Sequence, residues 1–512
     1  MRPINCIKLL MIALLGIQSS FAQNTTPKIC YEIFIRSFAD SNGDGIGDIN
    51  GITAKLDYLK NLGVDAVWIT PISKSPSYHK YDVTDYKSID PECGTIEDYK
   101  RLIAEAHKRN ILIIKDLVVN HTSSQHPWFQ EASKGKDNPY RDYYVWMTPK
   151  KIDSLGIARR EADGGSWELN PWHFVRPDDD EKYYGLFWGG MPDLNFDNPK
   201  VRQEIFEIGQ YWLKEVGVDG FRLDAAKHIY PEWEAEKCHQ FWAEFKAQMQ
   251  SAKPDVMLVG EVWAKADIVA PYFKSLNSNF NIDLAHGIHK AVGEGKDDGL
   301  IKKLIANYEV FKKSNPDFID ATIIDNHDQN RIASILNGEV AKTKAAANLL
   351  LTLPGQPYIY YGEELGMLGT KPDENIREAF LWDTKPNDKI RTNWLKGKLF
   401  STDETVKPLS IQSKDVNSVY NHYKTLIALR KSQPALWQIQ NPNIEAVETQ
   451  KEVIAFIRPH QTGDLLVVHN ISPVEQVITL PKKFQKVIYK TEPYRLNGEF
   501  LVVKPYSMVV MK

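Results

Sequence analysis

Several short apolar stretches of the sequence end in polar side chains that can carry out acid–base chemistry. A single carboxylate after a strand is more often a helix cap or a turn former. Several such strand ends that meet at one mouth of a fold are instead typical of a catalytic site. The stretches are residues 111–118, 220–223, 256–259 and 322–324, and the side chains that follow them are Asn120, His121, Asp224, Glu261, His327 and Asp328.

These groups permit the cleavage of a glycosidic bond. That reaction needs one carboxylate as nucleophile and a second carboxyl group that protonates the leaving oxygen. Asp224 is the nucleophile candidate, because Arg222 points to the same face of the strand and would keep Asp224 ionised. Glu261 is the acid/base candidate, because its Gly-Glu-Val-Trp setting would desolvate it and raise its pKa. Asp328 would be a third carboxylate, and His121 and His327 would donate hydrogen bonds to sugar hydroxyls.

The elements that must position these groups are strands and helices in alternation from residue 30 onward. This alternation indicates a parallel sheet with crossover helices. About eight units fit before residue 430, and no dinucleotide glycine fingerprint follows the first strand, so a closed (β/α)₈ barrel is favoured over an open doubly wound sheet. The expected strands are 31–34, 66–70, 111–118, 220–223, 256–259, 280–284, 322–324 and 358–361, and the expected helices include 52–62, 96–108, 201–216 and 342–351.

The alternation divides the chain into further parts. We assign residues 28–119 and 198–435 to the barrel. Residues 120–197 are rich in Gly, Pro, Asp and Trp and lack helical periodicity, so they form an inserted subdomain after the third strand. Residues 436–512 hold short strands separated by turns, which predicts a C-terminal antiparallel β-sandwich.

The N-terminus has the pattern of a secretory signal peptide over residues 1–22. Arg2 and Lys8 flank the start of an apolar run at 9–17, and small residues precede a cleavage point after Ala22. We therefore expect an exported protein, periplasmic or extracellular. No later stretch reaches about 18 uninterrupted apolar residues, so no membrane span is expected in the mature protein. The mature chain keeps Cys30, Cys93 and Cys238, which leaves one disulfide or three buried thiols open.

Composition narrows the class of partner. The chain has 63 Lys and Arg against 66 Asp and Glu, a net charge of −3, which offers no field for nucleic acid or anionic lipid. A neutral or small partner is expected, bound to a monomer. Some tryptophans lie in Gly- and Asp-rich sequence and suit stacking on the apolar faces of sugar rings. They are Trp146, Trp167, Trp172 and Trp188.

A loop at residues 40–48 has the ligand spacing of a calcium site. Oxygen side chains stand at positions 1, 3, 5 and 9, with a backbone carbonyl at position 7. Position 12 is Gly51 rather than a glutamate, so the loop is not an EF-hand. The alternative is a turn-rich loop whose side chains bond their own backbone. Its carboxylates would repel one another without a cation, so Ca²⁺ is predicted, with the ligands Asp40, Asn42, Asp44, Asp48 and the carbonyl oxygen of Ile46.

Four motifs in this order resemble the signature regions of glycoside hydrolase family 13, the α-amylase family. They are residues 116–121, 220–228, 260–263 and 326–328, and the resemblance covers nearly all of the mature chain. It implies that Asp224 is the nucleophile, Glu261 the general acid/base and Asp328 the transition-state stabiliser, with Arg222, His121 and His327 in supporting roles. The family is retaining, so the first two carboxyl groups should lie roughly 5–5.5 Å apart.

The same resemblance implies further site residues. Tyr81 matches the tyrosine that stacks under the sugar at the cleavage point, and His79 would lie nearby. Lys227 and His228 match residues that line the leaving-group side. Several family members carry a calcium loop after the first strand, in agreement with residues 40–48. Many also bind calcium between barrel and subdomain, which here would use Asn120, Asp193 and the carbonyl oxygen of His228.

Residues 191–195, Met-Pro-Asp-Leu-Asn, resemble the fifth region of intermediate bacterial α-amylases and neopullulanases. The N-terminal β domain typical of neopullulanases does not precede the first strand, which favours an α-amylase that cleaves internal α-1,4 bonds of starch or maltodextrins. An exo-acting α-glucosidase, a neopullulanase or cyclomaltodextrinase, and a transglycosylase stay open as alternatives. A non-catalytic binding homologue is disfavoured, because the three carboxylates are present.

Overall fold

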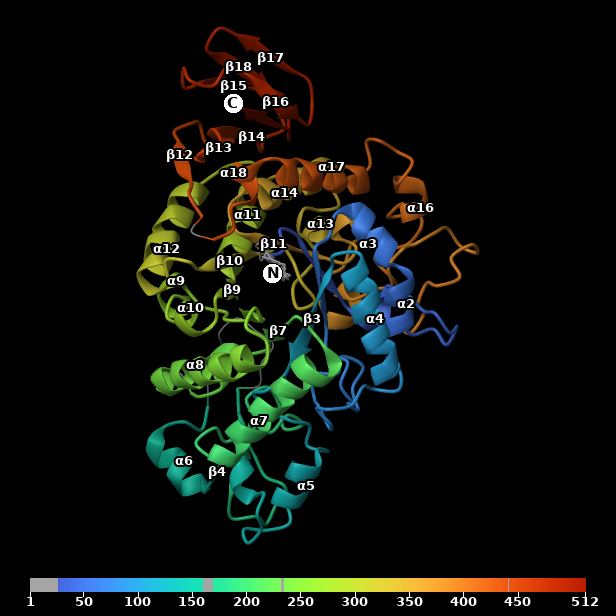
Figure 1. Cartoon of the computed structure of the whole chain (residues 1–512), viewed down its shortest axis with the longest axis vertical. Coiled ribbons are helices and arrows are strands. Elements are labelled where there is room, and N and C mark those ends of the chain that lie inside the picture. The colour runs from blue at the N-terminus through green and yellow to red at the C-terminus, as the bar shows by residue number, and fades with distance from the viewer. Residues whose placement is uncertain (1–25, 160–168, 232–233, 441) are drawn as a thin grey trace, which may run out of the picture.

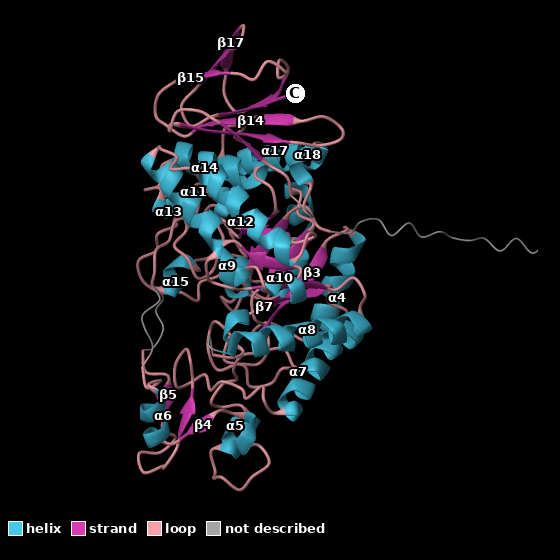
Figure 2. Ribbon diagram, turned by 90° about the vertical axis from the view of Figure 1, so that its left-hand side faces the viewer, coloured by secondary structure: helices cyan, strands magenta, loops and turns pink. Residues whose placement is uncertain are grey.

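The computed structural model describes residues 26–159, 169–231, 234–440 and 442–512. The predicted signal peptide and Trp167 lie outside the described residues. The barrel occupies the middle of the molecule, with the inserted subdomain at one end and the C-terminal sheets at the other (Figures 1 and 2).

Eight parallel strands close into a barrel in the order β1-β11-β10-β9-β8-β7-β3-β2, which confirms the predicted (β/α)₈ fold. The polar residues that follow these strands therefore gather at one mouth. The strands are β1 (Cys30–Ile33), β2 (Ala66–Ile69), β3 (Leu112–Leu117), β7 (Gly220–Leu223), β8 (Met257–Gly260), β9 (Ser278–Phe280), β10 (Ile319–Thr322) and β11 (Gln356–Tyr360).

Strand β10 lies earlier in the sequence than predicted. It ends at Thr322, where the predicted strand 322–324 begins. His327 and Asp328 therefore stand in a loop beyond the strand and not directly at its end. These residues stay at the carboxyl end of the barrel because the buried side chains of Glu32 and Arg377 contact them.

Helices surround the barrel, and local signals define where several of them begin. Thr95 and Asp98 form a reciprocal capping box at the start of α4. Asn198 caps α7, with Pro199 at its first position. The π-helical continuation η2 is capped at its C-terminal end by Gly217, which has a positive φ. The helices are α1 (Ile35–Phe38), α2 (Ile49–Ala54), α3 (Leu56–Leu62), α4 (Ile96–Lys108), α7 (Pro199–Tyr211), η2 (Trp212–Val216), η3 (Ala226–His228), α8 (Ala235–Ala252), α9 (Ala266–Val269), α10 (Tyr272–Ser275), α11 (Ile282–Glu294), α12 (Leu300–Ser314), α13 (Ile332–Ile335), α14 (Val340–Thr352), η5 (Glu363–Leu365), α15 (Asp373–Ile376), α16 (Leu409–Gln412), α17 (Val419–Ser432) and α18 (Pro434–Trp437).

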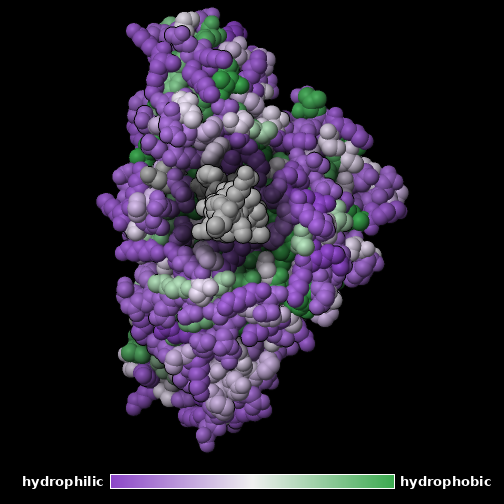
Figure 3. All heavy atoms as spheres, viewed as in Figure 1, coloured by the Kyte–Doolittle hydropathy of each residue, from purple (hydrophilic) through white to green (hydrophobic). Residues whose placement is uncertain are grey.

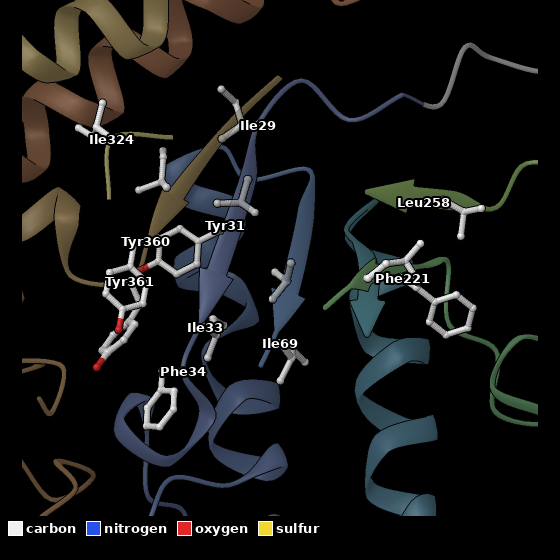
Figure 4. Packing of buried hydrophobic residues seen from close by; sticks show 14 of the residues in the cluster. Ile29, Tyr31, Ile33, Phe34, Ile69, Phe221, Leu258, Ile324, Tyr360 and Tyr361 are labelled. Carbon is white, nitrogen blue, oxygen red and sulfur yellow. The ribbon is translucent and has the colours of Figure 1, made fainter. Parts of the chain in front are cut away.

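Alternation along the strands separates two packed layers. In β1, Tyr31 and Ile33 belong to the large core between strands and helices, part of which Figure 4 shows. Cys30 belongs to a second core inside the barrel, where it joins Trp68 and Tyr358. Because side chains of a strand point alternately to its two faces, Glu32 also faces the barrel interior. That placement brings a buried carboxylate under the mouth.

The inserted subdomain contains helices that its sequence did not reveal. The absence of helical periodicity led us to expect none, but α5 (Pro127–Ala132) and α6 (Pro149–Leu155) are present. Both are too short to show a repeating apolar pattern, and each begins with proline at its first position. A small sheet completes the subdomain, with η1 (Arg141–Tyr143) beside it and the strand order β4 (Trp146–Met147), β6 (Lys182–Tyr184), β5 (Trp172–His173).

The C-terminal region is antiparallel, as predicted. One sheet has the order β12 (Glu445–Val447), β13 (Val453–Arg458), β14 (Leu465–Asn470), β19 (Met508–Met511), β16 (Val487–Lys490), and a second has the order β15 (Gln476–Thr479), β18 (Phe500–Val503), β17 (Tyr494–Asn497). Leu466 and Val468 from the first sheet share one apolar core with Leu501 and Val503 from the second. The two sheets therefore pack face to face as a sandwich.

Two further predictions concern cysteines and membranes. Cys30, Cys93 and Cys238 are all buried free thiols, which decides between the two alternatives left open by the sequence. Among the described residues, no helix is long and apolar enough to cross a membrane. The face of the molecule in Figure 3 is mainly hydrophilic, with apolar residues in small separate groups.

Candidate active site

Asp224 and Glu261 meet at the carboxyl ends of two adjacent strands. Strands β7 and β8 pair so that Leu223 lies opposite Gly260, which places the following carboxylates at the same level. The Arg222 side chain, fully buried, joins them. Its Nη1 donates to Asp224 Oδ1 at 2.7 Å, and its Nη2 lies 2.7 Å from Glu261 Oε2 without hydrogen-bond alignment. The structure thus brings the predicted nucleophile and acid/base together.

A buried frame holds Arg222 in place. Asp116, at the neighbouring position on β3, accepts from Arg222 Nη1 with both oxygens at 3.0 Å. Asp116 Oδ2 also accepts from Trp68 Nε1 at 3.0 Å and from Tyr81 Oη at 3.2 Å. One guanidinium is consequently shared among three carboxylates, those of Asp116, Asp224 and Glu261.

The groups around Asp224 shift its pKa in opposite directions. We expected Arg222 to keep it ionised, but burial raises the pKa of Asp224 well above its usual value, and Arg222 opposes that rise only in part. The carboxylates of Glu261 and Asp116 raise it further.

The side chain of Glu261 is oriented by two donors. Trp263 Nε1 donates to its Oε1 at 3.0 Å, and the backbone N–H of Ala225 donates to its Oε2 at 3.1 Å. Ala225 adopts a left-handed conformation with φ 48°, which is uncommon for a residue with a side chain. The turn after Asp224 thus points an N–H group toward Glu261, the predicted acid/base, and such local strain is typical of functional sites. Glu261 is 8% exposed, so the predicted desolvation is present.

Asp328 is held in the mouth by two cations. Its Oδ2 lies 3.1 Å from His327 Nε2, and its Oδ1 accepts from Arg377 Nη2 at 2.8 Å. Although burial opposes the effect, His327 and Arg377 lower the pKa of Asp328, so it is ionised. On its other side, His327 Nδ1 lies 2.5 Å from Glu32 Oε1. Burial lowers the pKa of His327, but Asp328 and Glu32 outweigh burial and raise it to about 10.

Tyr81 and the remaining predicted sugar-binding residues gather around these carboxylates. The Tyr81 ring is stacked on His327 with centroids 5.5 Å apart, and His121 Nε2 lies 3.2 Å from the Tyr81 carbonyl oxygen. The His79 ring lies 6.0 Å from that of Tyr81. On the Glu261 side, Lys227 Nζ donates to the Trp263 carbonyl at 3.2 Å, and the next residue is His228.

Sequence reasoning missed two of the groups that shape the site. Glu32 and Arg377 are both buried, and each contacts the His327–Asp328 pair directly. A glutamate inside an apolar strand was the available signal for Glu32. Arg377 follows the short helix α15 in the long connection between β11 and α17, where no pattern distinguishes it.

The predicted calcium loop shows the hydrogen bonds of a tightly turned loop. Asp40 accepts from the backbone N–H groups of Asn42, Gly43 and Gly45. Asp48 caps α2 through the Gly51 N–H at 2.8 Å. Within the described parts of the chain, no group of three or more His, Cys, Asp or Glu side chains is arranged to hold a metal ion.

The second predicted calcium position brings two of its residues together. Asn120 Nδ2 donates to Asp193 Oδ2 at 3.1 Å. Asn120 Oδ1 is buried and has no hydrogen-bond partner, so an acceptor oxygen is available beside a carboxylate.

Comparisons with known proteins agree with this geometry. The family model of the α-amylase catalytic domain matches residues 32–438, and that of the α-amylase SusG C-terminal domain matches residues 453–510. The chain is 45% identical to α-amylase 3 of Dictyoglomus thermophilum, over 94% of this chain and 93% of that protein. It is 36% identical to a 4-α-glucanotransferase of Thermotoga neapolitana, over 88% and 97%. The crystal structure of an α-amylase from H. orenii superposes with a TM-score of 0.85 at 39% identity, over 94% and 98%.

A (β/α)₈ barrel with paired carboxylates at its mouth and relatives of this kind defines a glycoside hydrolase. The chain belongs to the α-amylase family.

Proposed function

We propose that the protein is an α-amylase that hydrolyses internal α-1,4-glucosidic bonds of starch and maltodextrins with retention of configuration. The observation that carries this proposal is that one buried guanidinium, that of Arg222, contacts both Asp224 and Glu261, with ionised Asp328 at the same end of the barrel. The 45% identity to an α-amylase over nearly the whole chain supports the choice of bond.

The residues suit a double displacement. Asp224 attacks the anomeric carbon while Glu261 donates its proton to the leaving oxygen, which breaks the glycosidic bond and leaves a glycosyl ester on Asp224. Glu261, now a carboxylate, takes a proton from water as that water attacks the same carbon and releases Asp224. Ionised Asp328 accepts hydrogen bonds from sugar hydroxyls, and Arg377 and His327 hold it in position.

Product analysis on maltoheptaose, starch and pullulan tests the proposal. We expect maltoheptaose to yield several shorter maltooligosaccharides from the first minutes of reaction. Release of glucose alone from one end would identify an exo-acting α-glucosidase instead. Cleavage of pullulan in preference to starch would favour a neopullulanase.

Transfer to a sugar acceptor is the second candidate activity. The similarity to a 4-α-glucanotransferase supports it, because water and a sugar hydroxyl compete for the same glycosyl ester. The measurement that separates the two is the yield of products longer than the substrate at high maltooligosaccharide concentration. A yield that rises to dominate hydrolysis would make transfer the main activity.

Calcium is proposed for the loop at residues 40–48. Its oxygen donors, three of them carboxylates, are the hard ligands that Ca²⁺ prefers. Asp40, Asn42, Asp44, Asp48 and the Ile46 carbonyl would hold the ion, which would fix the loop after β1. A second calcium would be held by Asn120, Asp193 and the His228 carbonyl, where the unpartnered Asn120 Oδ1 supports it.

Export is proposed from the pattern of residues 1–22. Mass spectrometry of the secreted protein should then give the mass of a chain without these residues. Full-length protein retained in the cytoplasm would contradict export. A monomer is proposed as well, and gel filtration at a mass well above that of one chain would contradict it.

A further inference from the structure

The structure discriminates among the tryptophans that the sequence marks for sugar stacking, three of which it describes. Trp146 packs on Phe129 with ring planes 5° apart, and the Arg141 guanidinium lies 3.3 Å from the Trp146 ring centroid. Trp172 is only 7% exposed. Trp188 is 51% exposed. Of these three rings, Trp188 is the one with substantial surface to offer a ligand.

A glycine supports the Trp188 ring from beneath. A Cβ atom placed on Gly190 would lie 2.2 Å from both Cη2 and Cζ2 of the indole, a distance that real Cβ atoms do not tolerate. The six-membered part of the indole therefore rests directly on the Gly190 backbone. Gly190 is not among the glycines with positive φ, so the ring, and not the backbone conformation, is what requires the absence of a side chain.

The loop that carries Trp188 is held by hydrogen bonds on several sides. Met191 N–H donates to the Trp188 carbonyl at 2.9 Å, and Tyr183 Oη donates to the Gly189 carbonyl at 2.6 Å. Ser124 N–H donates to the Gly190 carbonyl at 2.8 Å. Because the loop is already ordered, a ligand that binds there loses little free energy to ordering it.

The residue before Trp188 places this loop beside the cleft. The Phe187 ring packs edge-on against His121 at 5.1 Å and against His228 at 6.2 Å. His228 follows Lys227, which bonds the backbone of Trp263, the residue that orients Glu261. Because Glu261 protonates the leaving oxygen, this chain of contacts locates the loop on the leaving-group side.

We infer that Trp188 is a platform for a glucose ring on the leaving-group side of the cleft. The apolar C–H face of a pyranose stacks on the exposed face of the indole, while Gly190 supports the opposite face. The ring bound there belongs to the departing part of the α-glucan in the first step. In the second step it belongs to an acceptor sugar that competes with water. This inference rests on the proposed function and assigns one of its subsites.

Two substrates that differ in their leaving group test the assignment. Maltoheptaose places sugar rings on the leaving-group side, whereas α-maltosyl fluoride releases fluoride and places none there. Trp188→Ala should lower kcat/KM on maltoheptaose about 10-fold, in line with the loss of one aromatic contact, and leave kcat/KM on α-maltosyl fluoride unchanged. With maltose added as acceptor, the same variant should form less maltotetraose per fluoride released.

Further variants separate the platform from a structural effect. Trp188→Phe keeps an aromatic face and should retain most of the activity on maltoheptaose. Gly190→Ala displaces the ring and should reproduce the selective loss although Trp188 is present. Phe500→Ala removes an aromatic side chain of similar exposure, 47%, from the C-terminal sandwich and should change neither substrate.

The outcomes also distinguish the subsite from the proposed function. If the wild-type enzyme cleaves both substrates, and Trp188→Ala loses activity equally on both or loses none, the platform is refuted and the proposed function stands. A wild-type enzyme that leaves both substrates intact refutes the proposed function and the subsite with it. Selective loss on maltoheptaose in Trp188→Ala and Gly190→Ala supports the assignment.

Discussion

The Glu32→Gln substitution isolates the charge that supports His327 beneath the active site. Glu32 and His327 are 1% and 0% exposed, and the Glu32 carboxylate lies 2.5 Å from His327 Nδ1. Glutamine can still accept a hydrogen bond from Nδ1, so the substitution removes the charge and preserves the contact. The variant therefore measures how strongly Glu32 stabilises the imidazolium.

The raised pKa of His327 determines how the stability of the folded protein changes with pH. A pKa of about 10 in the folded protein, against 6.5 for a free histidine, corresponds to roughly 5 kcal/mol of stabilisation of the folded state. Because the pKa is raised on folding, this contribution is complete below pH 6.5. It declines by roughly 1.4 kcal/mol per pH unit above that and is lost near pH 10.

Glu32→Gln should remove part of this contribution. A hydrogen bond to a charged group contributes about 1.5–3 kcal/mol, compared with about 1 kcal/mol between neutral groups. We therefore expect the free energy of unfolding to fall by roughly 1–2 kcal/mol at pH 6.5. The difference from wild type should shrink as pH approaches 10, where His327 becomes neutral and the buried Glu32 charge loses its partner.

Urea unfolding at pH 6.5, 8 and 9.5 gives the required free energies. Glu105→Gln is the control, because Glu105 is a surface carboxylate paired with Lys108 and Arg109, and its removal should produce no such pH dependence. A destabilisation of Glu32→Gln that stays constant over this pH range would refute the reasoning, since it would show that shape and not charge is what Glu32 supplies.

Three further predictions address the catalytic groups and the metal. Asp224→Asn should lower turnover of maltoheptaose by on the order of 10⁴-fold or more while calorimetry still detects binding; near-normal turnover would exclude Asp224 as nucleophile. Arg377→Lys keeps a positive charge but cannot bond Asp328, Asp373 and Tyr78 together, so kcat/KM should fall about 10- to 100-fold while the circular dichroism spectrum stays unchanged. An unchanged kcat/KM would contradict the positioning of Asp328 by Arg377. A chelator should lower the Tm of the wild type, and added Ca²⁺ should restore it, because a ligand that binds only the folded state stabilises that state. The Tm of Asp44→Ala should not respond to the chelator, and an unchanged wild-type Tm would argue against calcium in the loop at residues 40–48.

The parts of the site that could be predicted lie next to barrel strands in the sequence. Asp224 and Glu261 directly follow β7 and β8, so the strand pattern alone indicated that they would meet. Glu32 and Arg377 could not be found this way. The contacting residues are 295 positions apart in the sequence for Glu32 and His327 and 49 positions apart for Arg377 and Asp328, so no local pattern predicts either contact.

The sequence by itself determined the barrel and which carboxylates follow its strands, because periodicity and strand-end position are local properties of the chain. Only the tertiary structure decided how charge is distributed among them. In the sequence Arg222 neighbours Asp224 alone, whereas in the fold it serves Asp116 and Glu261 as well, so burial prevails and the pKa of Asp224 rises. The tertiary structure likewise left Trp188 exposed while it covered Trp146 and buried Trp172, because packing depends on neighbours that are distant in the chain.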